Sequence, residues 1–483
     1  MSENAAKFAA YTEARVQFWT EFARSFSRWQ RARKYYQKRL AEIYGLLIPP
    51  GMRVLEVGCG RGDLLAALKP AYGVGVDFCP AMIEIARREY PHLRFVDGDA
   101  HSFVISDGLD PGETFDYIVC SDLLNDLWDV QNVLENIGRH CHAGTRLILN
   151  GYSRLWELPR RAAEAVGLAA PQLKQNWLAP GDILNLMHLT DFEPIRVSHE
   201  ILWPFWTPPI HQFANKYLVK IPPFRWFALA NFFVARPVPR PVDAEPVVTV
   251  VVAARNEAGN ISQIFDRVPA MGAGTELIFV EGGSTDDTWD AIGREIARRP
   301  NVNAKLFRQQ GKGKGDAVRK GFSEATGDVL MILDADMTVA PEDLPRFYEA
   351  WRSGKGEFVN GVRLVYPMEG GAMRFFNHVG NKFFSLAFTW LLSQSIKDTL
   401  CGTKVLSRRN YEMLAANRGY FGEIDPFGDF DLIFGAAKYN LKIVDLPVRY
   451  GERTYGETNI QRWTHGMLLM RMVMKAMRKI KFV

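Results

Sequence analysis

The stretch that decides the fold of the first half reads VLEVGCGRG, residues 54–62. An apolar run leads into a glycine turn, which indicates a buried strand whose end lets the backbone approach a ligand. A dinucleotide-binding fingerprint would need its third glycine at position 63, where this chain has Asp63. The pattern is therefore GxGxG at the end of a strand.

Acidic residues follow at the ends of the next predicted strands. Asp77 follows the second strand, Asp99-Ala100 ends the third and Ser121-Asp122 ends the fourth. Open α/β sheets bind ligands at the carboxyl ends of their strands, so these residues are expected to line one site. A carboxylate at the position of Asp77 can accept hydrogen bonds from both ribose hydroxyls.

Short apolar runs alternate with amphipathic stretches in both halves, which predicts two α/β sheets with parallel strands. The expected strands of the first half are 53–57, 73–76, 93–96, 117–120 and 146–149, closing near 232–235. Those of the second half are 247–253, 277–280, 304–307 and 329–333. Four prolines at 237, 239, 241 and 246 predict a stiff linker, which gives domains 1–240 and 241–483. Before the first strand, about 45 residues have the spacing of one or two amphipathic helices.

Composition narrows the class of protein. The chain has 483 residues, 47% of them hydrophobic and 23% charged, which are values for globular domains. A net charge of +5 is too small to indicate a nucleic-acid partner. Five cysteines without a CxxC pair favour a reducing cytosol. Neither a signal peptide nor a spanning stretch is visible, so we expect a cytoplasmic protein, soluble or peripheral on the inner face of the plasma membrane.

Residues 53–152 resemble the class I S-adenosylmethionine-dependent methyltransferases, which have a Rossmann-like fold. The resemblance implies that Glu56 to Gly62, with Gly58 and Gly60, cradle the methionine part of the cofactor. It also implies that Asp77 holds the ribose and that Asp99-Ala100 lies by the adenine. The methyl acceptor is not readable, and the candidates for a base are His101, His140, His142 and Asp122. The aromatic segment 200–235 could shape an acceptor pocket, but core and lid packing is the favoured interpretation.

Polar turns end the strands of the second half as well. They contain Asn256-Glu257, then Glu281, then the pair Asp334 and Asp336, with a basic glycine-rich loop at 310–317. A nucleoside diphosphate leaving group concentrates negative charge, and carboxylates at a strand end can hold Mg²⁺ or Mn²⁺ against it. Lysines of the glycine-rich loop can add charge stabilisation.

From Val248 to about Trp463 the chain resembles glycosyltransferase family 2, which has the GT-A fold. Within it the likeness is to polyprenyl-phosphate sugar synthases of the dolichol-phosphate mannose synthase type. The motifs that carry this likeness are 334–336, 361–363, 398–404, 446–450 and 453–459. By resemblance, Glu257 and Glu281 face the nucleoside of a nucleotide-sugar, Asp334 and Asp336 the ribose-diphosphate and the metal, and Arg363 and Lys404 the phosphates.

Two departures from the family pattern affect the donor. The family usually has two aspartates where this chain has Glu281-Gly282, and often a proline where it has Ala253. The nucleotide is therefore not assigned.

The acceptor has two interpretations. Asp429 and Asp431 lie where family 2 enzymes with hydroxyl acceptors carry a catalytic base, whereas a lipid phosphate is already ionised and needs none. We favour a polyprenyl phosphate and keep a glycan hydroxyl, with Asp429 or Asp431 as base, as the alternative. The tail from Thr458 to Val483 has no acidic residue, which indicates either a basic amphipathic helix in peripheral contact with a membrane or a helix packed on the domain.

The expected function is a fused enzyme of surface glycan and cell-wall assembly. Its second half transfers a sugar with inversion, and its first half methylates a related sugar or intermediate. The competing class is a protein in which one half only binds and serves as a scaffold. Cofactor and nucleotide binding by the two halves discriminates between them.

Overall fold

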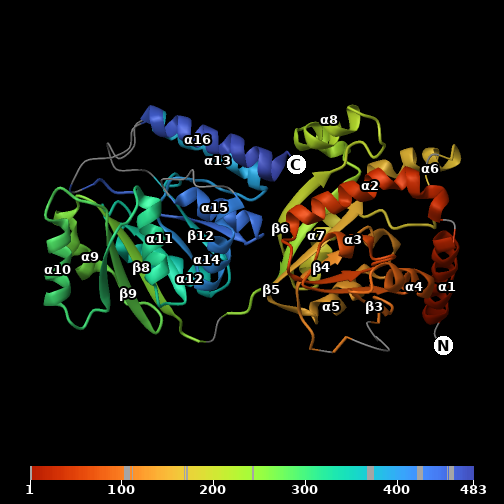
Figure 1. Ribbon diagram of the computed structural model, residues 1–483, viewed down its shortest axis with the longest axis horizontal. Helices are drawn as coiled ribbons and strands as arrows, with labels where there is room; N and C mark the ends of the chain where they lie inside the picture. Colours follow the sequence, from red (N-terminus) through yellow and green to blue (C-terminus); the bar gives the residue numbers. More distant parts are fainter. Residues whose placement is uncertain are drawn as a thin grey trace. The chain divides into compact units, whose positions relative to one another are not determined.

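Two sheets organise the chain, one in each half, as Figure 1 shows for the computed structural model. One unit comprises Met1–Val238 with Phe482–Val483, and the other comprises Pro239–Lys481. The structure describes residues 3–24, 26–102, 109–110, 112–167, 169, 172–241, 244–366, 375–420, 428–453, 455 and 462–482. Within these ranges, the side chains of 26–33, 375–379, 420 and 462–466 are not described.

The first sheet has the strand order β3-β2-β1-β4-β5-β7-β6. Its strands are β1 (Arg53–Val57), β2 (Tyr72–Asp77), β3 (Arg94–Asp97), β4 (Phe115–Cys120), β5 (Cys141–Tyr152), β6 (Phe192–Glu200) and β7 (Ala230–Pro237). The strands from β3 to β5 are parallel, and β7 runs antiparallel between β5 and β6. The order 3-2-1-4-5 is that of a Rossmann sheet, with its reversal point at the end of β1.

Helices cover both faces of this sheet. They are α1 (Glu3–Arg24), α2 (Phe26–Leu47), α3 (Asp63–Ala67), α4 (Pro80–Glu89), α5 (Val130–Gly138), α6 (Glu157–Ala165), α7 (Pro180–Leu189) and α8 (Ile210–Lys216). Neighbouring residues of β7 point to opposite faces, so Phe232 packs in one apolar cluster with Tyr44, and Phe233 packs in the other with Leu134. Helices α1 and α2 confirm the expected helical lead-in.

The second sheet has the order β10-β9-β8-β11-β13-β12-β14. Its strands are β8 (Val247–Ala254), β9 (Gly274–Glu281), β10 (Ala304–Arg308), β11 (Val329–Asp334), β12 (Phe358–Val362), β13 (Lys404–Ser407) and β14 (Ile443–Pro447). The four strands from β10 to β11 are parallel, and β13 is antiparallel to both of its neighbours. The parallel part holds the strand ends that carry the predicted site.

The second unit has its own helices around that sheet. They are α9 (Ile261–Arg267), α10 (Thr288–Arg298), α11 (Lys314–Glu324), α12 (Leu344–Arg352), α13 (Phe375–Leu392), α14 (Arg408–Ala416), α15 (Asp429–Lys438) and α16 (Arg462–Ala476). A short π-helix, η8 (Met477–Lys481), ends the tail. Among the described residues, no helix is long and apolar enough to cross a bilayer.

The tail helix packs on its own unit, which is one of the two interpretations of the sequence. In α16 one face is buried, with Leu469, Met472 and Val473 each at most 6% exposed, and the helix contacts α13. Its outer face carries the exposed Met467 and Met470 beside Arg471. The helix therefore packs on its own unit and still presents apolar and basic side chains outward.

Candidate functional sites

The glycine turn after β1 forms one wall of the first site. Gly58, Gly60 and Gly62 have φ angles of 74°, 52° and 77°, a region that side chains rarely adopt. A Cβ atom on Gly58 would lie 2.7 Å from Cδ1 of Leu123, whereas one on Gly60 would meet nothing within 4 Å. The backbone at Gly60 therefore faces open space that a ligand can enter.

Asp77, at the end of β2, is fixed by backbone amides. Its two carboxylate oxygens accept hydrogen bonds from the N–H groups of Gly60, at 2.8 Å, and Cys79, at 3.0 Å. Burial nonetheless raises the pKa of Asp77 to about 6, because the two hydrogen bonds offset only part of the desolvation. The carboxylate is thus positioned and still lacks a cationic partner among the described contacts.

Glu56, in β1, lies behind the same turn. Its side chain is buried, and burial raises its pKa well above the ordinary value. Within the described residues, Oε2 of Glu56 has no hydrogen-bond partner. A buried polar oxygen of this kind is usually satisfied in the complete site, so it marks a position for a donor from a ligand.

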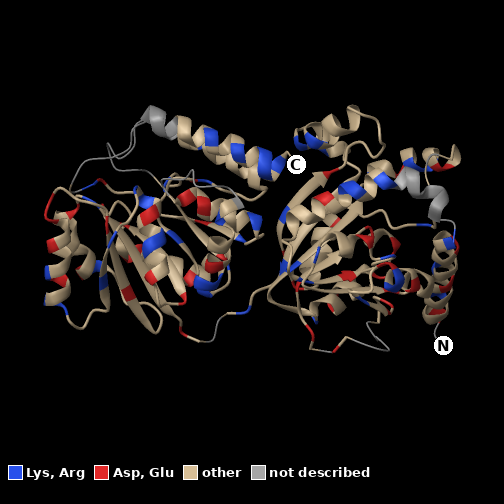
Figure 2. Cartoon of the chain, in the orientation of Figure 1, with Lys and Arg blue, Asp and Glu red and all other residues tan. Residues whose placement is uncertain are grey.

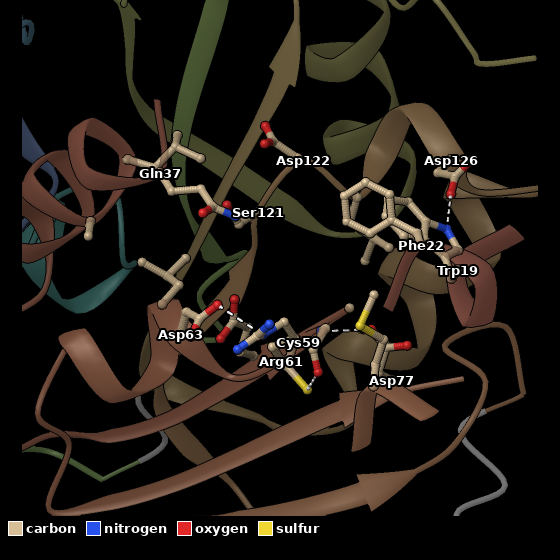
Figure 3. Close-up of a pocket in the computed structure, with 18 of the residues that line it drawn as sticks. Trp19, Phe22, Gln37, Cys59, Arg61, Asp63, Asp77, Ser121, Asp122 and Asp126 are labelled. Atoms are coloured by element: carbon tan, nitrogen blue, oxygen red, sulfur yellow. Dashed lines mark hydrogen bonds and ion pairs between the residues drawn. The ribbon is translucent and has the colours of Figure 1, made fainter. Parts of the chain in front are cut away.

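A cavity of about 370 Å³ opens at these strand ends (Figure 3). Besides Glu56 and the glycine turn, four aspartates line it: Asp63, Asp77, Asp122 and Asp126. Helices α1 and α2 supply the opposite wall with Trp19, Phe22, Gln37, Lys38, Leu40 and Ala41. The cavity is therefore acidic and partly aromatic.

Helix α1 is tied to this cavity through Asp126. The carboxylate accepts hydrogen bonds from Nε of Arg15, at 2.9 Å, and Nε1 of Trp19, at 3.0 Å. The backbone carbonyl of Asp126 accepts a further one from the Tyr11 hydroxyl. The residues before the first strand thus belong to the site, although sequence reasoning assigned them no function.

Asp99 and Ala100 line a smaller adjoining cavity together with Asp77 and His101. Asp99 accepts hydrogen bonds from the backbone N–H of His101 and from its Nδ1, at 2.8 and 2.7 Å. Although burial opposes it, this pairing lowers the pKa of Asp99. Nε2 of His101 accepts from the N–H groups of Trp128 and Asp129, so the ring carries its proton on Nδ1 and positions the loop.

The other three candidates for a base differ in their distance from the cavity. His140 and His142 lie at the start of β5, where they contact the Glu113 carbonyl and the Asp116 carboxylate, at the sheet edge opposite the cavity. Asp122 lines the cavity and accepts hydrogen bonds from Tyr36, at 2.9 Å, and Tyr152, at 3.1 Å. Of the four candidates, Asp122 is the one whose side chain lines the cavity of about 370 Å³.

The aromatic segment 200–235 was expected to pack in the core or as a lid, and only part of it does. The residues of β7 are buried, but most large apolar side chains between β6 and β7 are exposed. No residue of this segment lines the cavity of about 370 Å³. Core packing therefore does not explain these exposed residues.

In the second unit, the turns after β8 and β9 are joined by hydrogen bonds. The N–H of Asn256 donates to Oγ of Ser284 at 3.0 Å, and Oδ1 of Asn256 accepts from the N–H of Thr285 at 2.8 Å. Glu281 accepts from the N–H of Ser284. These contacts hold Glu257 and Glu281 at the ends of adjacent strands, as predicted for parallel β8 and β9.

The carboxylates at the end of β11 each contact a cation. Asp334 is paired with Nζ of Lys314, from the glycine-rich loop, and Asp336 accepts from Arg453 at 2.7 Å. Arg453 also donates a hydrogen bond to Glu257 at 3.1 Å. Burial raises the pKa of Glu257 to about 7, although the charge of Arg453 acts to lower it. Sequence reasoning gave Lys314 and Arg453 no individual role, although both belong to stretches that it singled out.

Arg363 and Lys404 are buried in polar networks. Arg363 makes two hydrogen bonds to Asp398, at 2.7 and 2.8 Å. Lys404 donates to Oδ1 of Asn360 and to the carbonyl of Cys401, at 3.0 and 2.6 Å. Burial raises the pKa of Asp334, but the charge of Lys314, followed by those of Arg363 and Lys404, brings it below the ordinary value. The three cations therefore act on one strand end.

Asp429 and Asp431 are both held by cations. Asp429 is buried at 3.6 Å from Nζ of Lys404. Asp431 lies 3.6 Å from Arg319 and 3.9 Å from Arg418. Both carboxylates therefore lie within ion-pairing distance of basic side chains.

The structure gives only partial support for a metal. Asp334 and Asp336 have the oxygen ligands that Mg²⁺ or Mn²⁺ prefers, but each faces a basic side chain. In the described part of the chain, no group of three or more His, Cys, Asp or Glu residues is arranged to hold an ion. Thr454 and residues 456–459 of the last motif lie outside the described residues.

Comparison with known families places a different family in each half. Residues 28–197 match the family described as "Methyltransferase domain", and residues 249–413 match "Glycosyl transferase family 2". The two units thus have a methyltransferase fold of the Rossmann-like class and a GT-A-like glycosyltransferase fold, as the sequence predicts.

Individual relatives cover parts of the chain. It is 29% identical to a dolichol-phosphate mannosyltransferase of Pyrococcus furiosus, over 44% of this chain and 59% of that protein. It is 33% identical to an undecaprenyl-phosphate 4-deoxy-4-formamido-L-arabinose transferase of Edwardsiella ictaluri, over 22% of this chain and 34% of that protein. The chain therefore spans less than two thirds of these relatives.

Among solved structures, a SAM-dependent methyltransferase of Thermotoga maritima is similar to the first unit. The match has a TM-score of 0.37 and 18% identity, and it covers 46% of this chain and 99% of that one. A likeness of this size carries no argument about activity.

Proposed function

Because this chain joins a methyltransferase domain to a domain of glycosyl transferase family 2, both of them enzyme domains, we propose that it is a bifunctional transferase. The second unit transfers a sugar, with inversion, from a nucleotide-sugar to a polyprenyl phosphate. The first unit uses S-adenosylmethionine to methylate a related sugar or intermediate. Both reactions belong to surface glycan biosynthesis and take place in the cytoplasm, at the inner face of the plasma membrane.

The acceptor proposal rests on the state of Asp431. This carboxylate stands where a base would serve a hydroxyl acceptor, and Arg319 and Arg418 hold it. A general base must give up its partner to take a proton, whereas an ionised lipid phosphate attacks without one. The arginines thus support a phosphate acceptor, and the names of the relatives agree with it.

In the second site, basic side chains meet the charge of the diphosphate. Lys314 and Arg453 are near enough to the β11 end to pair with carboxylates, and we propose that they turn to the phosphates when the donor binds. Asp336 would then hold Mg²⁺ or Mn²⁺ in place of Arg453, and such an ion would supply further charge stabilisation. Glu257 and Glu281 face the nucleoside.

In the first site, S-adenosylmethionine supplies an electrophilic methyl group on its sulfonium. Asp77 accepts hydrogen bonds from the ribose, Glu56 receives the amino group of the methionine part through its unsatisfied Oε2, and Asp99 with Ala100 borders the adenine. Asp122 is positioned to take a proton from the acceptor, with Tyr36 and Tyr152 orienting its carboxylate.

The test of sugar transfer uses the full chain, membranes, and a panel of labelled nucleotide-sugars with and without Mn²⁺. Label entering a lipid that mild acid cleaves supports a polyprenyl phosphate acceptor. Label found only on soluble saccharides would overturn it in favour of a hydroxyl acceptor. Failure of every donor to be used or hydrolysed would favour the scaffold class for this unit.

A further inference from the structure

The segment between β6 and β7 presents large apolar side chains outward. It contains α8, η3 (Leu218–Lys220) and η4 (Phe224–Phe227), and Figure 1 shows α8 beside the α/β body of its unit. Trp206 is 70% exposed and Trp226 58% exposed. Ile210, Phe213 and Phe227 are also more than half exposed. We call these five residues the aromatic face.

Polar groups inside the segment fix its shape. Asn215 is buried, and its Oδ1 accepts from the N–H of Trp203 at 2.8 Å. Its Nδ2 donates to the Trp203 carbonyl and to the Tyr35 hydroxyl, both at 2.7 Å. Lys220 and Glu200 form a buried ion pair. Hydrogen-bonding groups therefore point inward and aromatic rings outward, so the exposure of the aromatic face belongs to the folded structure.

The charges around the aromatic face have one sign. Apart from Lys220, which is buried in its ion pair with Glu200, residues 201–229 contain the basic residues Lys216 and Arg225 and no acidic residue. Lys216 is exposed and Arg225 half-buried, and Figure 2 shows blue but no red on this segment. Exposed tryptophan and phenylalanine beside lysine and arginine form the composition of surfaces that bind at the headgroup level of anionic bilayers.

We propose that the aromatic face docks the methyltransferase unit on an anionic phospholipid bilayer. Charge selects this occupant over a second copy of the same unit, because a second aromatic face is basic too and would bring like charges together. Anionic headgroups instead complement Lys216 and Arg225 and receive the indole rings. The end of the tail contacts this segment at Tyr217, whose ring centroid lies 5.2 Å from that of Phe482, and none of the five residues of the aromatic face takes part in that contact.

A site-specific probe tests the proposal in the full chain. W206C and W226C are labelled with the environment-sensitive dye NBD and mixed with vesicles of phosphatidylcholine alone or with phosphatidylglycerol. We expect a blue shift at both positions, and quenching by brominated lipid, only with the anionic vesicles. L158C is the matched control, because Leu158 is 75% exposed on α6 of the same unit.

The contrary outcomes are also specific. Absence of a shift at both positions with anionic vesicles, or an equal shift at L158C, would overturn the proposal. Labelled parent protein corrects for the native cysteines. Independently, the double variant W206S/W226S should bind these vesicles about tenfold less well, while L158S binds as the parent does. Unchanged binding of the double variant, with an unchanged melting temperature, would count against docking through this face.

Discussion

In the first unit, Asp77 is held by two backbone N–H groups, whereas in the second unit Asp334 and Asp336 are each held by a basic side chain. The balance of charge around the two sites also differs. Glu56, Asp63, Asp122 and Asp126 line the first cavity with Lys38 and Arg61, and Asp126 pairs with Arg15. Around the second strand end, Lys314, Arg363, Lys404 and Arg453 accompany the acids.

The difference matches the charge of the proposed ligands. S-adenosylmethionine carries a sulfonium and an ammonium group, so the carboxylate of Asp77, which is held by backbone N–H groups and not by a basic side chain, favours it. A nucleoside diphosphate is a polyanion, and a strand end lined only by acids would repel it. Both sheets carry acidic residues at comparable strand ends. The two sites therefore differ mainly in the basic side chains that other segments place beside those acids.

The largest expected effect comes from Asp336. Asp336→Asn removes the charge that positions Arg453 and would hold a metal, so sugar transfer should fall by about 10²–10³-fold. Binding of S-adenosylmethionine should not change, since the two sites belong to separate sheets. Asp290→Asn, an exposed aspartate of α10, is the control in the same transfer assay. Full transfer by Asp336→Asn would remove this residue from the site.

Asp77→Ala should give the next largest effect. Loss of a charged acceptor for the ribose hydroxyls is expected to weaken S-adenosylmethionine by about 10–100-fold in calorimetry. Glu84→Ala, on the exposed face of α4, should bind as the parent protein does. Equal affinities for all three proteins would contradict the assigned role of Asp77.

The pH dependence of cofactor binding sharpens the same contrast. The pKa of Asp77 is raised to about 6, so its carboxylate is ionised at pH 7 and mostly protonated at pH 5. Affinity for S-adenosylmethionine should therefore fall as pH decreases through 6, by about tenfold between pH 7 and pH 5. The raised pKa also means that this group stabilises the ligand-free fold at low pH and that the contribution is lost as pH rises through 6. Asp77→Asn should remove the pH dependence of affinity; its persistence in that variant would assign it to another group.

The smallest effect is expected at Asp431. Asp431→Asn should retain sugar transfer within about tenfold, because the carboxylate organises Arg319 and Arg418 and does not remove a proton. A loss of about 10²–10⁴-fold would identify it as a general base and favour the hydroxyl acceptor. Asp429→Asn tests the second carboxylate in the same way.

The parallel strands β1 to β5 and β8 to β11 could be predicted, because each is a local apolar run that ends in a polar turn. β12 to β14 could not, since they have only four or five residues each and pair with segments far away in sequence. β6 was not predicted either. The acids of both sites were likewise visible as strand-end residues. Among the cations, Arg363, Lys404 and the lysines of the glycine-rich loop were also visible in their motifs. The pairing of Arg453 with Asp336 was not, because Arg453 reaches that carboxylate only through the fold. Large aromatic residues are usually buried, so the sequence favoured core or lid packing for the segment around Trp206 and did not predict its exposure.

The central claim is that one chain carries two independent sites for ligands of opposite charge. Calorimetry on the full chain tests it most directly, with S-adenosylmethionine and a nucleoside diphosphate (UDP or GDP, with Mn²⁺) titrated in either order. The account predicts one site for each ligand, no competition, and weaker binding of only one ligand in each of Asp77→Ala and Asp336→Asn. Displacement of one ligand by the other, or loss of both in a single variant, would contradict it.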